Sequence, residues 1–247
     1  MKKIYTLLLA LMLVLPATYA QKGLSLGLNG EFLGTTIVNQ NTWGNGHEYD
    51  YDISTGSAFG LDVGYNFNDK IGIYTGFSMM NLGQKYKDTY STPGTTIESD
   101  WSRQLKFKYN VIPIMVKFVG SETTVNFIGG FGISIAMMKE ASQIWTKDGA
   151  DYHEIFENEF TGETFDMGAE DVTERFNKTD IFVNLEMGAR IFFMDNLYMD
   201  ATLNAGYGVK DMNQSDWQMK NKDGEYNPSH NGYIGAKIGI AYVLFGE

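Results

Sequence analysis

Residues 234–244 read IGAKIGIAYVL and place an apolar side chain at every second position. The positions between them hold Gly235, Lys237 and Gly239, so the two faces of this segment differ in chemistry. A period of two is the period of a β-strand, whose successive side chains point to opposite faces. This stretch therefore predicts a strand with one apolar face and one face of small and charged residues.

Seven further segments repeat this pattern along the chain. They lie near residues 24–32, 59–67, 71–79, 105–111, 125–137, 181–191 and 197–209. Their connections alternate between short ones, at 68–70, 120–123 and 194–196, and long ones, at 35–56, 84–100, 139–178 and 211–230. This alternation is typical of an eight-stranded antiparallel up-and-down transmembrane β-barrel with short periplasmic turns and long external loops. The fold class is therefore all-β, and we expect both termini at the periplasmic end.

The second face of the segments distinguishes a membrane barrel from a soluble one. A face turned to water favours Lys and Glu, whereas the interior of a narrow eight-stranded barrel favours residues without bulk, and this face is rich in glycine. The charged residues among the glycines include acids and bases that can pair inside a closed barrel. We therefore expect a structural ion-pair network that plugs the lumen, made of Asp62, Lys106, Lys108, Glu186, Arg190, Asp200 and Lys237.

The first twenty residues differ in composition from the rest. Lys2 and Lys3 precede a short apolar run, and small residues, including Ala20, follow Pro16, as in a cleaved secretory signal peptide. The expected organisation is a signal peptide over residues 1–20 and an outer-membrane β-barrel domain over residues 21–247. The chain has no cysteine, which excludes a lipid-anchoring cysteine and thiolate chemistry, and its net charge of −11 argues against nucleic acid as a partner.

The stretch from Lys106 to Phe118, KFKYNVIPIMVKF, changes character halfway along. We interpret its first half as a strand whose lysines face the lumen and whose Phe107 and Tyr109 face lipid. In its second half, Ile112, Ile114 and Val116 are expected to fill an apolar floor at the periplasmic base. Pro113 cannot donate to a β-ladder, so a bulge or an omitted ladder bond, with a possible shift of register, is predicted there.

This proline-containing run also carries a resemblance. The run Ile112-Pro113-Ile114-Met115-Val116-Lys117-Phe118, followed by a turn and by Gly-Gly-Phe-Gly at 129–132, resembles the PorT-like outer-membrane β-barrel family of Bacteroidetes. The resemblance implies an eight-stranded barrel and, for the founding member of the family, a role in type IX protein secretion and gingipain export. It implies no catalytic residues.

Candidate chemical groups are concentrated in the long connections. His47, His153 and His230 all lie there, and no spacing around them matches a known catalytic triad. Residues 139–178 hold eleven acids against four bases, which suits either divalent-cation binding or a solvated acidic loop that bridges to lipopolysaccharide through ambient cations. Tyr152, Ile155, Phe156 and Phe160 are expected to form one face of a short helical lid, to which Phe165 and Phe176 contribute. The sequence Asn221-Lys222-Asp223-Gly224-Glu225 is interpreted as an ordinary turn.

These features predict a non-enzymatic outer-membrane protein with a plugged lumen, no cofactor, and a role at the cell surface or in the envelope. The alternatives are a PorT-like accessory in type IX secretion and, with less support, an enzyme with its site at the extracellular rim. Expected partners are outer-membrane lipids and lipopolysaccharide, the barrel-assembly machinery during insertion, and a protein bound through the external loops.

Overall fold

The computed structural model describes most of the chain after residue 21, in segments. The described residues are 22–39, 50–68, 70–92, 95–120, 124–151, 155–157, 164–166, 170–218 and 224–245. The predicted signal peptide, His47, His153 and residues 221–223 lie outside them. Within the described residues, no helix is long and apolar enough to cross a membrane.

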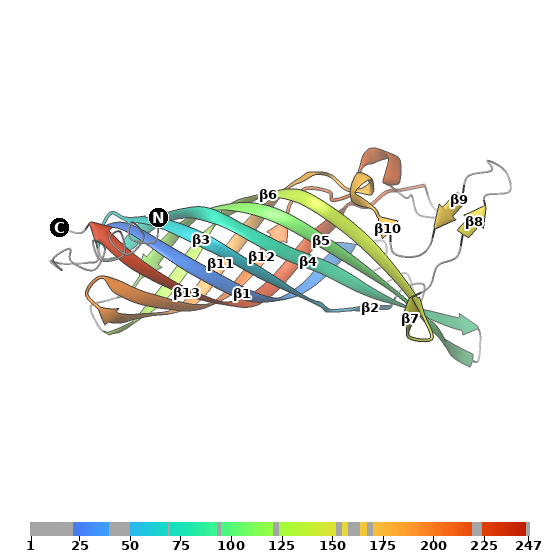
Figure 1. The fold of residues 1–247 in the computed structure, drawn as a ribbon, viewed down its shortest axis with the longest axis horizontal. Helices are drawn as coiled ribbons and strands as arrows, with labels where there is room; N and C mark the ends of the chain where they lie inside the picture. Colours follow the sequence, from blue (N-terminus) through green and yellow to red (C-terminus); the bar gives the residue numbers. More distant parts are fainter. Residues whose placement is uncertain are drawn as a thin grey trace, which may run out of the picture.

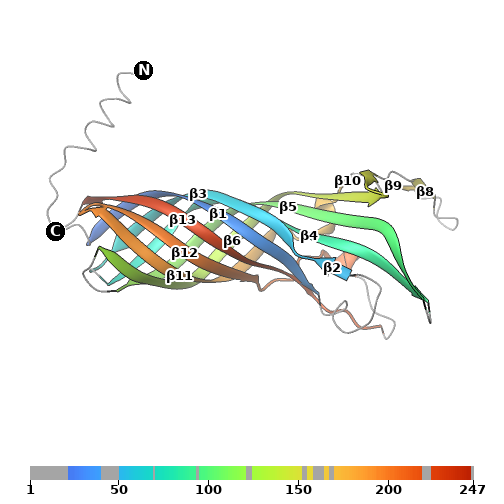
Figure 2. The ribbon, with the colours of Figure 1, turned by 90° about the horizontal axis from the view of Figure 1, so that it is seen from below.

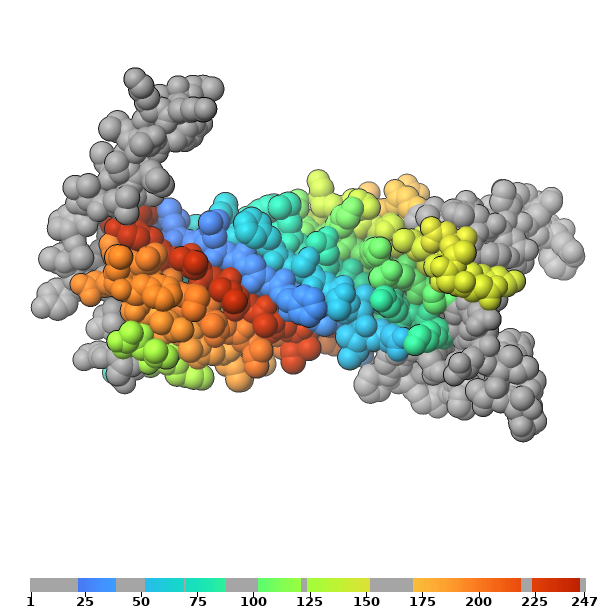
Figure 3. All heavy atoms as spheres, turned by 60° about the horizontal axis from the view of Figure 1, so that its bottom comes forward, coloured from blue at the N-terminus to red at the C-terminus, as the bar shows by residue number. Residues whose placement is uncertain are grey.

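Eight long strands of the described chain form a closed antiparallel ring (Figure 1). In ring order they are β1 (Gly23–Asn39), β3 (Ser54–Asn66), β4 (Ile71–Thr92), β5 (Thr95–Val119), β6 (Val125–Lys147), β11 (Thr179–Met194), β12 (Leu197–Gly208) and β13 (Ser229–Phe245). The ring closes because β13 pairs with β1 along almost its whole length, from Leu24↔Phe245 to Asn39↔Ser229. Figure 3 shows these two strands side by side, β13 in red and β1 in blue. The predicted eight-stranded up-and-down barrel is confirmed.

The two ends of the barrel differ. One end holds the start of β1, the end of β13 and the three short connections β3–β4, β5–β6 and β11–β12, and we call it the short-turn end. The opposite, long-loop end carries the short strands β2 (Asp50–Asp52), β7 (Ala150–Asp151), β8 (Ile155–Glu157), β9 (Thr164–Asp166) and β10 (Glu170–Asp171), and the 3₁₀ helices η1 (Thr173–Arg175) and η2 (Ser215–Trp217). The three short connections and the long connections β1–β3, β6–β11 and β12–β13 are as predicted, whereas the β4–β5 connection is not long.

Several strands run farther than the sequence pattern indicates. Residues 84–100, predicted as a loop, belong mainly to β4 and β5, which stay paired out to Thr92↔Thr95 and extend beyond the ring (Figure 2). Likewise β6 continues to Lys147. The backbone ladder does not need an apolar outward face to continue. The alternation therefore fades from the sequence before the strand ends.

A band of apolar side chains surrounds the outside of the short-turn half. Large exposed hydrophobics occur on all eight ring strands, for example Leu28 on β1, Phe59 on β3, Ile114 on β5 and Leu185 on β11, each 45–59% exposed. Along β5 the outward apolar or uncharged residues run from Phe118 to Asn110, which is close to the roughly 9–11 residues that a tilted transmembrane strand needs. This outer surface is suited to lipid.

Strand β5 corrects the interpretation of the 106–118 stretch. Phe107 and Tyr109 are buried inside the barrel, at 0% and 2% exposure, while Lys106 and Lys108 point outward and are exposed. Ile112 and Ile114 are also outward, so they do not form an apolar floor. Inward and outward side chains therefore alternate without change from Lys106 to Phe118. What changes along the strand is the environment of its outward face. Near the short-turn end the outward face is apolar, and near the long-loop end it is charged.

Pro113 keeps this inward–outward alternation, but the pairing of β5 with β4 is interrupted beside it. On the β6 side it pairs in register with Ser134. On the β4 side the ladder passes from Ile114↔Thr75 to Val111↔Ser78 and skips the two pairs between them, although the register is the same on both sides. The Thr75 hydroxyl donates to the Pro113 carbonyl at 2.8 Å. The predicted omitted ladder bond is confirmed. A register shift does occur between β5 and β6, but it lies at Lys108/Tyr109.

Candidate functional site

The interior of the short-turn half is a cluster of buried charges, which we call the inner plug. It consists of Glu31, Asp62, Lys117, Glu186, Arg190, Asp200 and Lys237. Lys117 Nζ lies 2.8 Å from Glu186 Oε1, and both side chains are about 95% buried, at 4% and 5% exposure. The pair joins β5 to β11 across β6, where Gly130 is the register partner of both residues. A Cβ on Gly130 would come within 3.1 Å of the Lys117 side chain, so the glycine leaves the space that this ion pair occupies.

A second ion pair lies closer to the short turns. Arg190 and Asp200 are direct register partners on β11 and β12, and the guanidinium binds the carboxylate through two hydrogen bonds of 2.7 and 2.9 Å. The guanidinium carbon also lies 3.8 Å from the centroid of the Tyr198 ring. In addition, Arg190 donates to the hydroxyl of Tyr74 at 3.1 Å, and that hydroxyl donates to Asn66. A buried charge is tolerated only when it is paired and hydrogen-bonded, and this arginine is both.

Lys237 on β13 links the two remaining acids. Its Nζ lies 3.7 Å from Glu31 and 3.6 Å from Asp62. Glu31 also accepts a hydrogen bond from Asn204 on β12. The inner plug therefore joins side chains from six of the eight ring strands into one filled layer.

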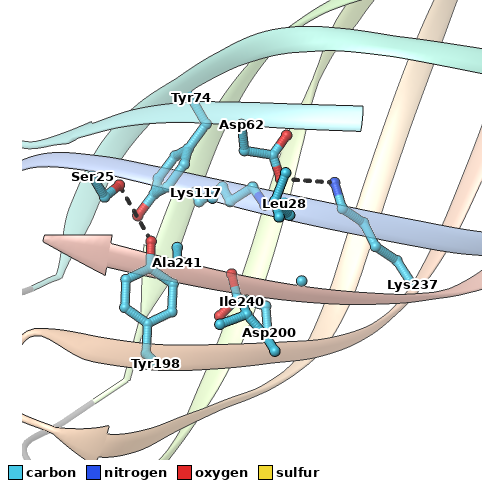
Figure 4. Close-up of a pocket in the computed structure, with 12 residues that line it drawn as sticks. Ser25, Leu28, Asp62, Tyr74, Lys117, Tyr198, Asp200, Lys237, Ile240 and Ala241 are labelled. Atoms are coloured by element: carbon cyan, nitrogen blue, oxygen red, sulfur yellow. Dashed lines mark hydrogen bonds and ion pairs between the residues drawn. The ribbon is translucent and has the colours of Figure 1, made fainter. Parts of the chain in front are cut away.

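A small cavity of about 10 Å³ lies between these groups. Figure 4 shows residues that line it, among them Tyr74, Lys117, Tyr198 and Lys237. A single water needs roughly 10–15 Å³, so this cavity holds at most about one. It offers no room for a substrate.

The predicted lumen residues divide into two groups. Asp62, Glu186, Arg190, Asp200 and Lys237 lie together in the inner plug. The prediction is wrong for Lys106 and Lys108, which lie outside the barrel, where Lys108 pairs with Glu140 at 2.9 Å and both side chains are largely exposed. These lysines stand above the apolar band, where the outward face meets water and a charge needs no burial.

Sequence reasoning missed Lys117 and Glu31 as members of the plug. Lys117 stands at an odd-numbered position of β5, as do the buried Val111 and Met115. Had the strand been assigned one constant alternation, a lysine beside lipid-facing Val116 and Phe118 would have been placed inside. Glu31 lies between the outward-facing Gly30 and Phe32, and its position follows from the same argument.

The long-loop half has the opposite interior, which we call the outer core. Buried apolar residues fill it: Leu33, Ile37, Ala58, Met80, Leu82, Leu105, Phe107, Tyr109, Val111, Ala136, Met138, Ala141, Val172, Phe176, Phe182 and Met212. Phe107 makes an edge-to-face contact with Phe176, with ring centroids 4.9 Å apart. Because Val172, Phe176 and Met212 come from the loops, the core continues into the connections that cover it. Phe176, which was expected to contribute to a helical lid, packs into this core instead.

We call residues 172–178 and 209–218 the cap. Backbone bonds join its two halves, from Asn177 N to Met212 O at 2.7 Å and from Gln214 N to Arg175 O at 3.0 Å. The carboxylate of Asp211 accepts four hydrogen bonds, from the backbone N–H groups of Asn213 and Ser229 and from the side chains of Gln218 and Tyr226. Burial, together with the adjacent Asp211 carboxylate, raises the pKa of Tyr226 to about 12, so its hydroxyl stays protonated and donates at neutral pH.

The remaining loop predictions have mixed outcomes. Ile155 and Phe156 belong to strand β8, which pairs with β9, so the predicted helical lid is wrong there, while Tyr152 and Phe160 lie outside the described residues. The ring of His230 hydrogen-bonds through Nδ1 to the Lys210 carbonyl at 3.1 Å and lies 5.2 Å from the Tyr207 ring. In the part of the chain that the structure describes, no three His, Asp or Glu residues gather to hold a metal ion.

The inner plug predicts a large difference between buried and exposed ion pairs. Replacing one partner of the buried pair, by Lys117→Met or Glu186→Gln, leaves a buried charge unpaired and should lower the free energy of unfolding by about 3–5 kcal/mol. The double variant should lose less than the sum of the singles. Urea titration of the barrel refolded in lipid vesicles measures this. The matched control is the exposed pair, where Lys108→Met or Glu140→Gln should cost no more than about 1 kcal/mol. Equal costs at both pairs would contradict the buried arrangement.

The cap makes a separate prediction. Asp211→Ala removes the acceptor of four hydrogen bonds, so the cap should open more often while the ring stays folded. Limited trypsin digestion should then cut after Lys210 severalfold faster than in the wild type. Asp216→Asn is the control, because Asp216 is exposed and accepts from its neighbour Ser215 alone among the described residues. Unchanged cleavage in Asp211→Ala would show that this carboxylate does not hold the cap.

Comparison with known proteins places this architecture in a family. The sequence pattern of the outer membrane protein beta-barrel domain matches residues 6–223. No curated protein sequence matches the chain.

Solved structures with a similar arrangement include three bacterial barrels. OprG from Pseudomonas aeruginosa is 11% identical, with a TM-score of 0.44 and coverage of 92% of this chain and 98% of that one. Ail of Yersinia pestis is 12% identical, with a TM-score of 0.39 and coverage of 90% and 99%. The outer membrane protease OmpT from Escherichia coli is 8% identical, with a TM-score of 0.41 and coverage of 92% and 99%. The family pattern spans most of the sequence and agrees with the closed eight-stranded ring. The chain therefore belongs to the outer membrane protein beta-barrel domain family.

Proposed function

We propose that this outer-membrane protein is a non-enzymatic barrel with a closed lumen, which acts through its outer surface and external loops. The observation that carries the proposal is the filling of the barrel along its axis. The inner plug occupies the short-turn half, and the outer core with its cap occupies the long-loop half. A solute would have to break buried ion pairs and then cross a packed apolar core.

The chemistry of the described loops supports the absence of catalysis. His230 Nδ1 is engaged by the Lys210 carbonyl and its ring lies beside that of Tyr207, and among the described residues no hydroxyl or carboxylate is hydrogen-bonded to this imidazole. The charged groups of the inner plug are paired with one another around a space for about one water. Neither place combines a base, a nucleophile and room for a substrate, which a catalytic site requires.

Orientation and export complete the proposal. In this family of barrels the short turns face the periplasm, so the cap and the extended β4–β5 hairpin face outside the cell. Residues 1–20 then serve as the export signal, and the barrel-assembly machinery inserts the mature chain.

Planar-bilayer recording tests the closed lumen. The purified wild-type barrel should give no steady conductance steps of the size that a porin gives in the same lipid, because the inner plug and the outer core fill the lumen with paired charges and packed apolar side chains. The porin serves as the positive control for insertion. Regular ohmic steps of porin size from the wild-type protein would overturn the proposal.

A second candidate function is that of an accessory in type IX protein secretion. It is favoured by the likeness of residues 112–118 and 129–132 to the PorT-like pattern. In this structure Pro113 marks the interrupted β4–β5 ladder, and Gly130 makes room for the Lys117–Glu186 pair, so both motif positions also have structural roles. Deleting the gene and comparing the secreted proteins decides the matter. Loss of secreted cargo that the wild-type gene restores would favour this function, and an unchanged set would reject it.

A further inference from the structure

The outward face of three neighbouring strands carries a group of exposed lysines, which we call the lysine patch. It consists of Lys85 on β4, Lys106 and Lys108 on β5, and Lys139 on β6. In the β4–β5 register Lys106 lies opposite Gly83 and Lys85 lies opposite Gln104, so Lys85 and Lys106 are diagonal neighbours. Such neighbours lie roughly 7–8 Å apart, near enough for two ammonium groups to reach one ligand.

The patch lies beyond the apolar band, toward the long-loop end. On each of its strands one large hydrophobic side chain is the last that is exposed before the first lysine: Met79 at 57%, Ile112 at 36% and Met137 at 36%. The first lysine beyond the band on β4 is Lys85, six residues after Met79. On β5 it is Lys108, four residues before Ile112, and on β6 it is Lys139, two residues after Met137. A molecule with its chains on this part of the band would therefore have its polar head beside the lysines.

The other ring strands lack this feature. On β1, β3, β11, β12 and β13, the outward positions of the described strand residues hold no lysine or arginine. Among the strand residues, the outward lysines are therefore confined to one side of the barrel, while the exposed Lys178 and Lys210 lie just outside β11 and β12. A general belt of interfacial charge would be distributed around the whole ring, so this one-sided cluster suggests a ligand with a defined place.

Asp52, the register partner of Lys85, pairs with Lys87. Lys108 pairs with Glu140, but Lys85, Lys106 and Lys139 form no ion pair within the described part of the chain. This excess stands on a protein whose net charge is −11. Retaining like charges side by side costs energy unless an anion lies between them.

We propose that the lysine patch binds the phosphate groups of a phosphorylated lipid of the outer leaflet, whose acyl chains lie on Met79, Ile112 and Met137. Lysine binds phosphate as a point charge and tolerates several geometries, which suits a headgroup at a fluid surface. The leaflet follows from the orientation of the long loops. The site is independent of whether the lumen is closed.

Lipid-binding measurements on the folded barrel in detergent test this site. Native mass spectrometry counts the bound molecules of diphosphoryl lipid A and of fully dephosphorylated lipid A. Inorganic phosphate is added in a separate measurement as a competing free anion. The triple variant K85Q/K106Q/K139Q removes the unpaired lysines and leaves the Lys108–Glu140 pair intact. The control K22Q/K70Q/K210Q removes the same charge outside the patch. Each variant is checked for folding on a denaturing gel, where a folded barrel migrates faster unheated than after boiling. The double variant K106Q/K139Q replaces the triple variant if the triple does not fold.

The wild type and the control should bind diphosphoryl lipid A more tightly than the dephosphorylated form. The triple variant should bind diphosphoryl lipid A weaker by roughly tenfold or more, because each lysine near an anionic surface contributes to binding. Equal affinity in the wild type and the triple variant would overturn the proposal. So would a wild type that does not distinguish the two lipids. Displacement of lipid A by an equal concentration of inorganic phosphate would assign the patch to a free anion and overturn the lipid as its ligand.

Discussion

Backbone pairing in a membrane is the constraint on which the rest of this structure depends. Hydrocarbon offers no partner for an N–H or C=O group, so a sheet that crosses it has to close on itself. Here the closure is the long β1–β13 pairing, which leaves no free edge in the ring. Closing only eight strands makes a narrow tube, and a narrow tube has to be filled by its own side chains. The inner plug and the outer core are two ways of filling it.

The two fillings follow from what surrounds the barrel at each height. Beside lipid the outer face is apolar, and the inside holds charges that pair across the lumen, such as Arg190 with Asp200. Beyond the lipid the outside is hydrated, and the inside becomes an ordinary apolar core around Phe107 and Phe182. The long-loop half thus resembles a soluble barrel built on top of a membrane barrel. The cap completes that core, because Phe176 and Met212 supply side chains that the strands do not.

The inner plug also explains why glycine is so frequent on the inward face. A buried Lys117 has to pass over β6 to reach Glu186, and only a residue without a side chain leaves that path open at position 130. Gly64 likewise faces the Tyr74 ring, which a Cβ would meet at about 2.4 Å. Small residues on one strand therefore make room for large residues on its neighbours. Stability and closure of the lumen come from the same packing.

The period-two pattern, the alternation of connection lengths and the glycine-rich face by themselves determined the barrel, its strand number, its short turns and most of its buried charges. These are local signals, since each strand records the two environments that it separates. The sequence alone did not decide which face of β5 is inward. If lipid surrounds this part of the strand, Phe107 faces outward and Lys106 faces the lumen. If water surrounds it, Lys106 faces outward and Phe107 is buried inside. Only the tertiary structure showed where the membrane band ends, and therefore that Lys106 and Lys108 lie outside the barrel. Polarity reports the surroundings of a side chain, and those surroundings depend on the position of the residue along the barrel axis.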